Sequence, residues 1–114
     1  MFINRLLLLF ILFETPIAYA GQVTQGGLKV TKVMTGYSGE EAFFLVDEVP
    51  SNPNECVGTT STYHVLAVDP SKSNVDQVVS ILLTAFASGK NIEVQVYDDS
   101  CFNGHAVIRR VAIY

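Results

Sequence analysis

Only one segment of the chain has hydrophobic residues at helical spacing, and it lies between segments that are rich in strand-forming residues. Within residues 75–86, apolar side chains recur at intervals of three and four, which predicts an amphipathic helix. They are Val75, Val78, Val79, Leu82, Leu83 and Phe86. Ser73 starts this helix, Asp76 places a carboxylate in its first turn, and Gly89 ends it. The rest of the fold therefore has to come from strands.

Five segments are predicted to be strands: residues 28–35, 41–49 and 63–68 before the helix, and 92–97 and 105–114 after it. The first is rich in Val and Thr but alternates imperfectly, which indicates a bulge or strong curvature. The fourth alternates cleanly, with its β-branched residues on one face.

Short polar segments separate these strands. Residues 98–100 are expected to end the fourth strand, and residues 101–104 to form a turn. Within that turn, Asn103 and Gly104 suit positive φ angles.

The predicted order is β-β-β-α-β-β, a mainly β chain with one helix. This is the order of the OB-fold, a small Greek-key β-barrel with a helix between its third and fourth strands. An apolar face on the helix is expected if the helix covers one end of such a barrel. The alternative is an open α+β sheet with the helix packed on one face.

The first 20 residues resemble a secretory signal peptide. Arg5 precedes an unbroken apolar run at 6–13, Pro16 follows, and Ala18 and Ala20 form an A-x-A cleavage site before Gly21. The run is too short to span a bilayer as a helix, and no longer apolar span follows it. We therefore expect a single exported domain at 21–114, periplasmic or secreted, without a membrane span after cleavage.

The predicted export determines how the two cysteines are interpreted. In an oxidising compartment, Cys56 and Cys101 are most simply one disulfide. Such a bridge would close about 45 residues and stabilise the fold by about 4 kcal/mol. A free thiol and an intermolecular bridge are the alternatives.

Composition excludes several functions. Seven Lys and Arg against eleven Asp and Glu give a net charge of −4, unlike a nucleic-acid binder. The chain has no phosphate-binding glycine motif and no G-x-S-x-G nucleophile motif. Its two histidines, His64 and His105, and the adjacent Asp98 and Asp99 lack the spacing of a metal or acid–base site. We therefore expect no catalysis, no cofactor and no metal.

The aromatic residues are the better candidates for a site. Alternation does not place all of them inward, so we select Tyr37, Tyr63, Tyr97 and Phe102 as candidate ligand-binding residues. An exposed aromatic ring stacks on a sugar or anchors a protein partner. The alternative is that these rings line the core or cover the ends of a barrel.

Several stretches resemble a known family. These are the signal peptide, Thr35-Gly36 at the end of the first strand, and the segment at 88–94 after the helix. With them, the chain resembles small exported bacterial OB-fold proteins similar to the B subunits of AB5 toxins, the subtilase cytotoxin B subunit in particular. The segments at 52–56 and 101–104 also resemble small exported bacterial proteins of this shape. The resemblance implies a glycan-binding subunit that often forms a ring pentamer.

The leading hypothesis is an exported binding module that recognises a glycan or an envelope or host protein. The second is a self-assembling structural or toxin-B-like subunit, in which the last strand at 105–114 pairs edge to edge with another copy. A small exported enzyme or inhibitor is the third hypothesis.

Overall fold

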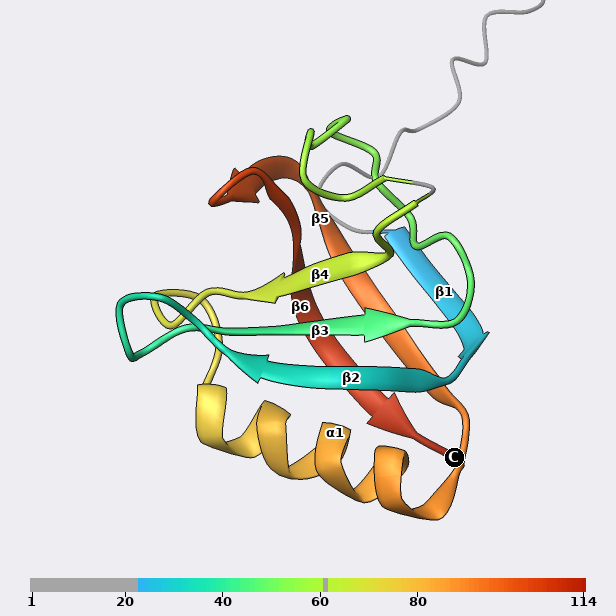
Figure 1. Ribbon diagram of the computed structural model, residues 1–114. Helices are drawn as coiled ribbons and strands as arrows, with labels where there is room; N and C mark the ends of the chain where they lie inside the picture. Colours follow the sequence, from blue (N-terminus) through green and yellow to red (C-terminus); the bar gives the residue numbers. More distant parts are fainter. Residues whose placement is uncertain (1–22, 61) are drawn as a thin grey trace, which may run out of the picture.

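A computed structural model describes residues 23–60 and 62–114 (Figure 1). The predicted signal peptide at 1–20 lies outside these residues. In chain order the elements are β1 (Val23–Leu28), β2 (Val30–Thr35), β3 (Ala42–Val46), β4 (Val65–Val68), α1 (Val75–Ser88), β5 (Ile92–Phe102) and β6 (His105–Ile113). A mainly β chain with one helix is therefore confirmed.

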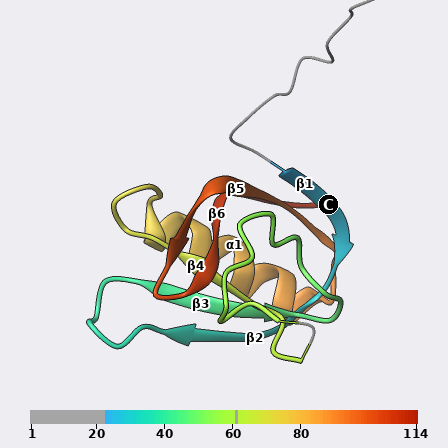
Figure 2. The ribbon, with the colours of Figure 1, turned by 90° about the horizontal axis from the view of Figure 1, so that it is seen from above.

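The strands form one mixed sheet in the order β1-β5-β6-β4-β3-β2. β4 and β6 run parallel, and the other neighbours are antiparallel. The two edge strands, β1 and β2, are nonetheless consecutive in the sequence. The sheet therefore curls, and the chain passes from one edge to the other along one side of the molecule (Figure 2). The two edges do not pair with each other in the described residues, so hydrogen bonds do not close the predicted barrel.

The first predicted strand, at 28–35, is wrong in its boundaries. The structure has two strands, β1 and β2, with only Lys29 between them. The predicted irregularity is confirmed, because the pairing register shifts on both sides of Lys29. The Lys29 N–H donates to Asp47 Oδ1 at 2.9 Å, and the Asp47 N–H donates back to the Lys29 carbonyl at 3.0 Å. The bend thus satisfies its own backbone groups and lets one stretch of chain pair with β5 first and β3 next.

The helix begins one residue later than predicted. Asn74, not Ser73, is the N-cap, and its side chain accepts from the Gln77 N–H at 3.2 Å. The predicted end is confirmed, since Gly89 adopts φ 69° and donates to the Ala85 carbonyl at 2.9 Å. The helix contacts β2, β6 and β3. Its buried face is Val78, Leu82 and Ala85.

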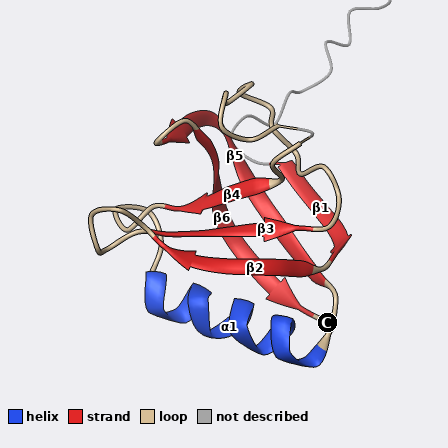
Figure 3. Cartoon of the chain, viewed as in Figure 1, coloured by secondary structure: helices blue, strands red, loops and turns tan. Residues whose placement is uncertain are grey.

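Part of the predicted apolar face of α1 is uncovered. Leu83 is 51% exposed and Phe86 is 52% exposed, although both continue the helical pattern. The helix lies along one side of the curled sheet (Figure 3). The side that it buries carries Val78, Leu82 and Ala85, so about half of the surface of Leu83 and of Phe86 stays exposed.

The prediction that the fourth strand ends at residue 97 is wrong, because β5 continues to Phe102. Its register with β6 shifts between Val96 and Cys101, and the ladder then resumes up to the Phe102–His105 pair. The predicted turn at 101–104 is wrong in its length, because Cys101 and Phe102 belong to the strand and pair with β6. The expected positive φ angles are confirmed, at 49° for Asn103 and 81° for Gly104. The ladder with β6 therefore carries the polar residues 98–100 into a strand.

β6 is not an edge strand. It lies between β5 and β4, and Ala106 and Val107 pair with Leu66 and Ala67 of β4. The prediction that the last strand offers a free edge to another copy is therefore wrong for this part of β6. The edge strands of the sheet are β1 and β2, and in the described residues the pairing of β6 with β4 does not continue beyond Val107.

The sheet has buried side chains on both faces. The main core lies between the curled sheet and α1 and includes Phe44, Leu66, Leu82, Val94 and Ile108. A smaller cluster on the opposite face of β3 and β4 is made of Phe43, Val65 and Ala67. Phe43 and Val65 of this outer cluster also line the candidate site.

Candidate binding site

The long loop between β3 and β4, described at 47–60 and 62–64, forms one wall of the candidate site. Asn52 organises it. Its Nδ2 donates to the carbonyls of Cys56 at 2.9 Å and Thr59 at 2.7 Å, and its Oδ1 accepts from the Cys56 N–H at 2.8 Å. One side chain therefore holds the middle of the loop in a fixed turn.

The predicted disulfide is confirmed. Cys56 and Cys101 are bonded, with their Cα atoms 5.8 Å apart and a separation of 45 positions in the sequence. Because Cys101 lies near the end of β5, the bond fastens the loop to the β5–β6 hairpin.

Three further hydrogen bonds hold the same loop against β4, β6 and the turn between β5 and β6. The buried Thr59 hydroxyl donates to the Val65 carbonyl at 2.7 Å and accepts from the Ala106 N–H at 2.7 Å. The Gly58 N–H donates to the Gly104 carbonyl at 2.6 Å. A Cβ at residue 58 would lie 2.5 Å from the His105 ring, so only glycine lets the loop approach this closely.

Between this loop and the sheet lies a cleft of about 440 Å³, which we call the aromatic cleft. Its lining comes from β2, β3, β4, the start of β6 and two loops. The residues are Met34, Thr35, Tyr37, Phe43, Val57, Gly58, Tyr63, Val65 and His105. No Asp, Glu, Lys or Arg occurs among these described residues, so the cleft favours an uncharged, partly apolar group.

Two tyrosines stand at the aromatic cleft. Tyr37 is 99% exposed and Tyr63 is 64% exposed. Their apolar base includes Phe43, against which the His105 ring packs edge-on with centroids 5.1 Å apart. Exposed rings above an apolar base suit a ligand with a flat apolar face, and each phenol hydroxyl adds a hydrogen-bonding group.

The turn that carries Tyr37 is closed by the buried Glu41. The Glu41 carboxylate accepts from the Ser38 hydroxyl and, at 2.8 Å, from the Ser38 N–H. These hydrogen bonds lower the pKa of Glu41 below its ordinary value, the hydroxyl contributing most. The Gly36 N–H donates to the Glu41 carbonyl at 2.9 Å and completes the turn. Glu41 therefore positions the segment from which Tyr37 projects.

The structure brings together two of the four predicted site residues. Tyr37 and Tyr63 line one cleft. Phe102 is not in the lining and packs behind it, with its ring centroid 6.4 Å from that of Phe43. Tyr97 lies elsewhere, with the Lys72 ammonium 4.4 Å from its ring centroid. Phe102 thus supports the base of the cleft, and Tyr97 is not part of it.

Sequence reasoning missed His105, Phe43 and Val57 as members of the cleft. His105 was considered only as a metal or acid–base residue. Phe43 lies on a strand whose two faces are both buried, which alternation alone does not reveal. The Asn-Gly turn and the paired cysteines were signals that the hairpin and the loop meet near His105 and Val57.

The other candidate side chains form no cluster. His64 Nδ1 lies 3.0 Å from the Val46 carbonyl, and Asp98 and Asp99 lie within β5. Within residues 23–60 and 62–114, no group of three or more His, Cys, Asp or Glu side chains is placed to hold a metal.

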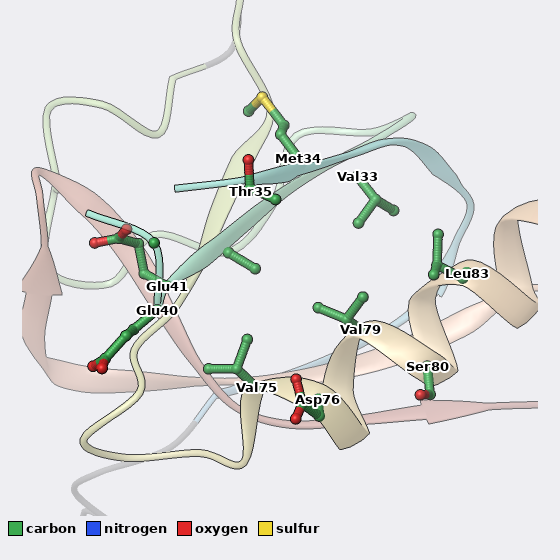
Figure 4. Close-up of a pocket in the computed structure, with 12 residues that line it drawn as sticks. Val33, Met34, Thr35, Glu40, Glu41, Val75, Asp76, Val79, Ser80 and Leu83 are labelled. Carbon is green, nitrogen blue, oxygen red and sulfur yellow. The ribbon is translucent and has the colours of Figure 1, made fainter. Parts of the chain in front are cut away.

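A second cavity, which we call the helix groove, has a volume of about 590 Å³ and lies between β2 and α1. Figure 4 shows Val33 of β2 and Val75, Val79 and Leu83 of α1 around the space between strand and helix. Glu40 and Asp76 lie near the N-terminal end of the helix, and neither forms an ion pair with a described residue. The groove therefore combines an apolar base with a negatively charged end.

Comparison of the chain with models of known protein families, with curated proteins and with solved structures finds no match. In the part of the chain that the structure describes, no helix has both the length and the apolar character needed to cross a membrane.

Proposed function

We propose that this protein is an exported, non-catalytic binding module whose ligand, a glycan or a protein partner, occupies the aromatic cleft. The observation that carries the proposal is the position of Tyr37 and Tyr63. They come from separate loops, both are exposed, and both line one uncharged cleft. Large aromatic rings left in water at a concave site favour a binding role, because ligand binding would bury them.

The path of the chain supports an OB-fold of the Greek-key type as part of this proposal. The bent segment β1–β2 pairs with β5 at one end and with β3 at the other. β4 and β6 are parallel, and α1 lies between β4 and β5 in the sequence. OB-folds bind oligosaccharides and oligonucleotides on the face of their second and third strands, beside the loops after the first and fourth strands. The aromatic cleft lies at the corresponding place, on β3 and β4, beside Tyr37 and the β5–β6 turn.

Export is proposed from two features that agree. The first 20 residues have the pattern of a cleavable signal, and the mature part holds a disulfide. A periplasmic or secreted location follows from the proposal, and the resemblance to toxin B subunits belongs to it as well. Self-assembly into a ring remains a prediction.

The test is a binding screen with the chain produced through its own export signal. The protein is applied to a glycan array and to a library of random peptides displayed on phage, beside the variant Tyr37→Ser/Tyr63→Ser. Because both side chains are exposed, the variant should keep its fold. Loss of aromatic anchors should weaken binding about tenfold or more.

Tyr97→Ser is the matched control, since it removes a tyrosine outside the aromatic cleft and should bind as the wild type does. Ligands that bind the double variant as well as the wild type would contradict the proposal. So would the absence of any ligand in both screens.

A further inference from the structure

The two cavities lie on opposite sides of one strand end. Met34 and Thr35 of β2 line both the aromatic cleft and the helix groove. β2 is also the last strand in the sheet order, so one of its edges has no partner strand among the described elements. An open backbone edge therefore runs between the two cavities.

The register shows which backbone groups face that edge. The Gly36 N–H donates to the Glu41 carbonyl, so Gly36 bonds to the partner strand. Met34 lies two residues before Gly36 and is paired with Phe43 of β3. In an antiparallel pair, residues alternate between those that bond to the partner strand and those that point away from it. Thr35 and Val33 therefore direct their N–H and C=O groups away from β3. Thr35 is exposed, whereas Val33 is half-buried and packs against the core, so the open edge is most accessible at Thr35.

A strand laid along this edge would use both cavities at once. Successive side chains of a strand point to opposite faces of the sheet. One set would reach the aromatic cleft beside Met34 and Tyr37. The other set would reach the helix groove and cover Leu83, which lines it and is largely exposed.

The acidic residues of the helix groove indicate which kind of added strand would bind there. Glu40 and Asp76 lie at one end of the helix groove without an ion-pair partner in the described residues. No Lys or Arg occurs among the described residues that line either cavity. A ligand segment with a cationic residue near this end complements the groove.

We propose that the open edge of β2 binds an extended, cationic peptide segment of another protein by strand addition. Its alternate side chains enter the aromatic cleft and the helix groove. This inference rests on the proposed function, because one set of side chains uses the same cleft. A peptide fits better than a sugar, because the edge presents regularly spaced backbone donors and acceptors that only another strand matches.

The experiment starts from peptides that the wild-type chain selects from the phage library. They are synthesised with a fluorescent label, and their affinity is measured by anisotropy. Each peptide is then methylated at one backbone nitrogen at a time, which removes a donor and leaves the side chain. Strand addition predicts a loss of about tenfold or more at every second residue and little change between, because only alternate N–H groups face β2.

Two protein variants test the same edge. Thr35→Pro removes an N–H that points to the open edge, so it should weaken peptide binding about as much as the sensitive methylations do. Glu40→Lys/Asp76→Lys should weaken it about fivefold at low salt, and less at high salt. The methylation scan leaves the protein intact, so the result does not depend on how well either variant folds.

The outcomes separate the two proposals. Peptides that need Tyr37 and Tyr63 but tolerate methylation everywhere would overturn strand addition and keep the aromatic cleft as a site. Glycan binding that needs the tyrosines, with no peptide selected, would do the same. If the wild-type chain self-associates and Thr35→Pro is monomeric, the edge is occupied by a second copy and the proposal is wrong. Selected peptides that depend on neither the tyrosines nor the edge would overturn both proposals.

Discussion

Removing the disulfide between Cys56 and Cys101 should lower the free energy of unfolding by a calculable amount. The bond joins residues that are 45 apart in sequence, so it restricts a loop of that length in the unfolded chain. The loop-entropy relation gives about 4 kcal/mol at 25 °C for such a loop. Small domains are stable by only about 5–15 kcal/mol, so the loss is a large part of the total.

The assay is urea unfolding of the wild type and of Cys56→Ala/Cys101→Ala, followed by circular dichroism. A slope of about 1–2 kcal/mol/M converts the loss into a decrease of about 2–4 M in the unfolding midpoint. Wild-type protein with its disulfide reduced is the matched control and should unfold near the midpoint of the double variant.

A loss of less than about 1 kcal/mol would refute this reasoning. It would mean that the disulfide does not destabilise the unfolded chain by lowering its conformational entropy as much as the relation requires. The contacts that Asn52 makes within the loop, and those that Thr59 makes with β4 and β6, would in that case account for the order of the loop. A large loss in the double variant with no loss on reduction of the wild type would instead assign the effect to the substituted side chains.

Two further predictions come from particular contacts, and a third comes from the resemblance to ring-forming toxin B subunits. Gly58→Ala puts a Cβ about 2.5 Å from the His105 ring, so the ring must move. We expect the free energy of unfolding, measured by heat or urea, to fall by about 1–3 kcal/mol. An unchanged His105 ring resonance in NMR spectra would contradict this prediction. The pKa of Glu41 is lowered because hydrogen bonds in the folded state stabilise its ionised carboxylate. The contribution of Glu41 to stability is therefore present above the ordinary glutamate pKa of about 4.3. It is lost as the pH falls through the lower pKa that Glu41 has in the folded state. Glu41→Gln should therefore be less stable than the wild type at neutral pH, with the difference shrinking in acid, and a difference independent of pH would refute the role given to the Ser38 hydrogen bonds. Light scattering after size exclusion should show a discrete pentamer if the predicted ring forms, and a monomer at high concentration would remove that prediction.

The best sequence predictions concern elements whose cause is local. The helix at 75–88 and its end at Gly89 follow from spacing and from one residue that adopts positive φ. The burial of Ile92, Val94 and Val96 follows from simple alternation, and the tight turn follows from Asn103-Gly104. Each of these patterns lies within a dozen or so residues, so the sequence contains the information directly.

The errors occur where a distant segment supplies the partner. Lys29 interrupts the first strand because Asp47, on another part of the chain, takes up its backbone groups. Residues 98–100 extend β5 because β6 pairs again beyond the register shift. Leu83 remains largely exposed because the sheet packs against the side of the helix that carries Val78, Leu82 and Ala85. None of these causes is visible within a window of sequence.

By itself, the sequence determined the balance of one helix against many strands, the place of the helix before the last two strands, and the pairing of Cys56 with Cys101 once export was inferred. Only the tertiary structure decided that β2 is an edge strand while the last strand lies inside the sheet. It also decided that Tyr37 and Tyr63 share one cleft while Tyr97 lies apart. The physical reason is that local pattern sets which face of an element is apolar, whereas strand order and loop closure set which elements meet.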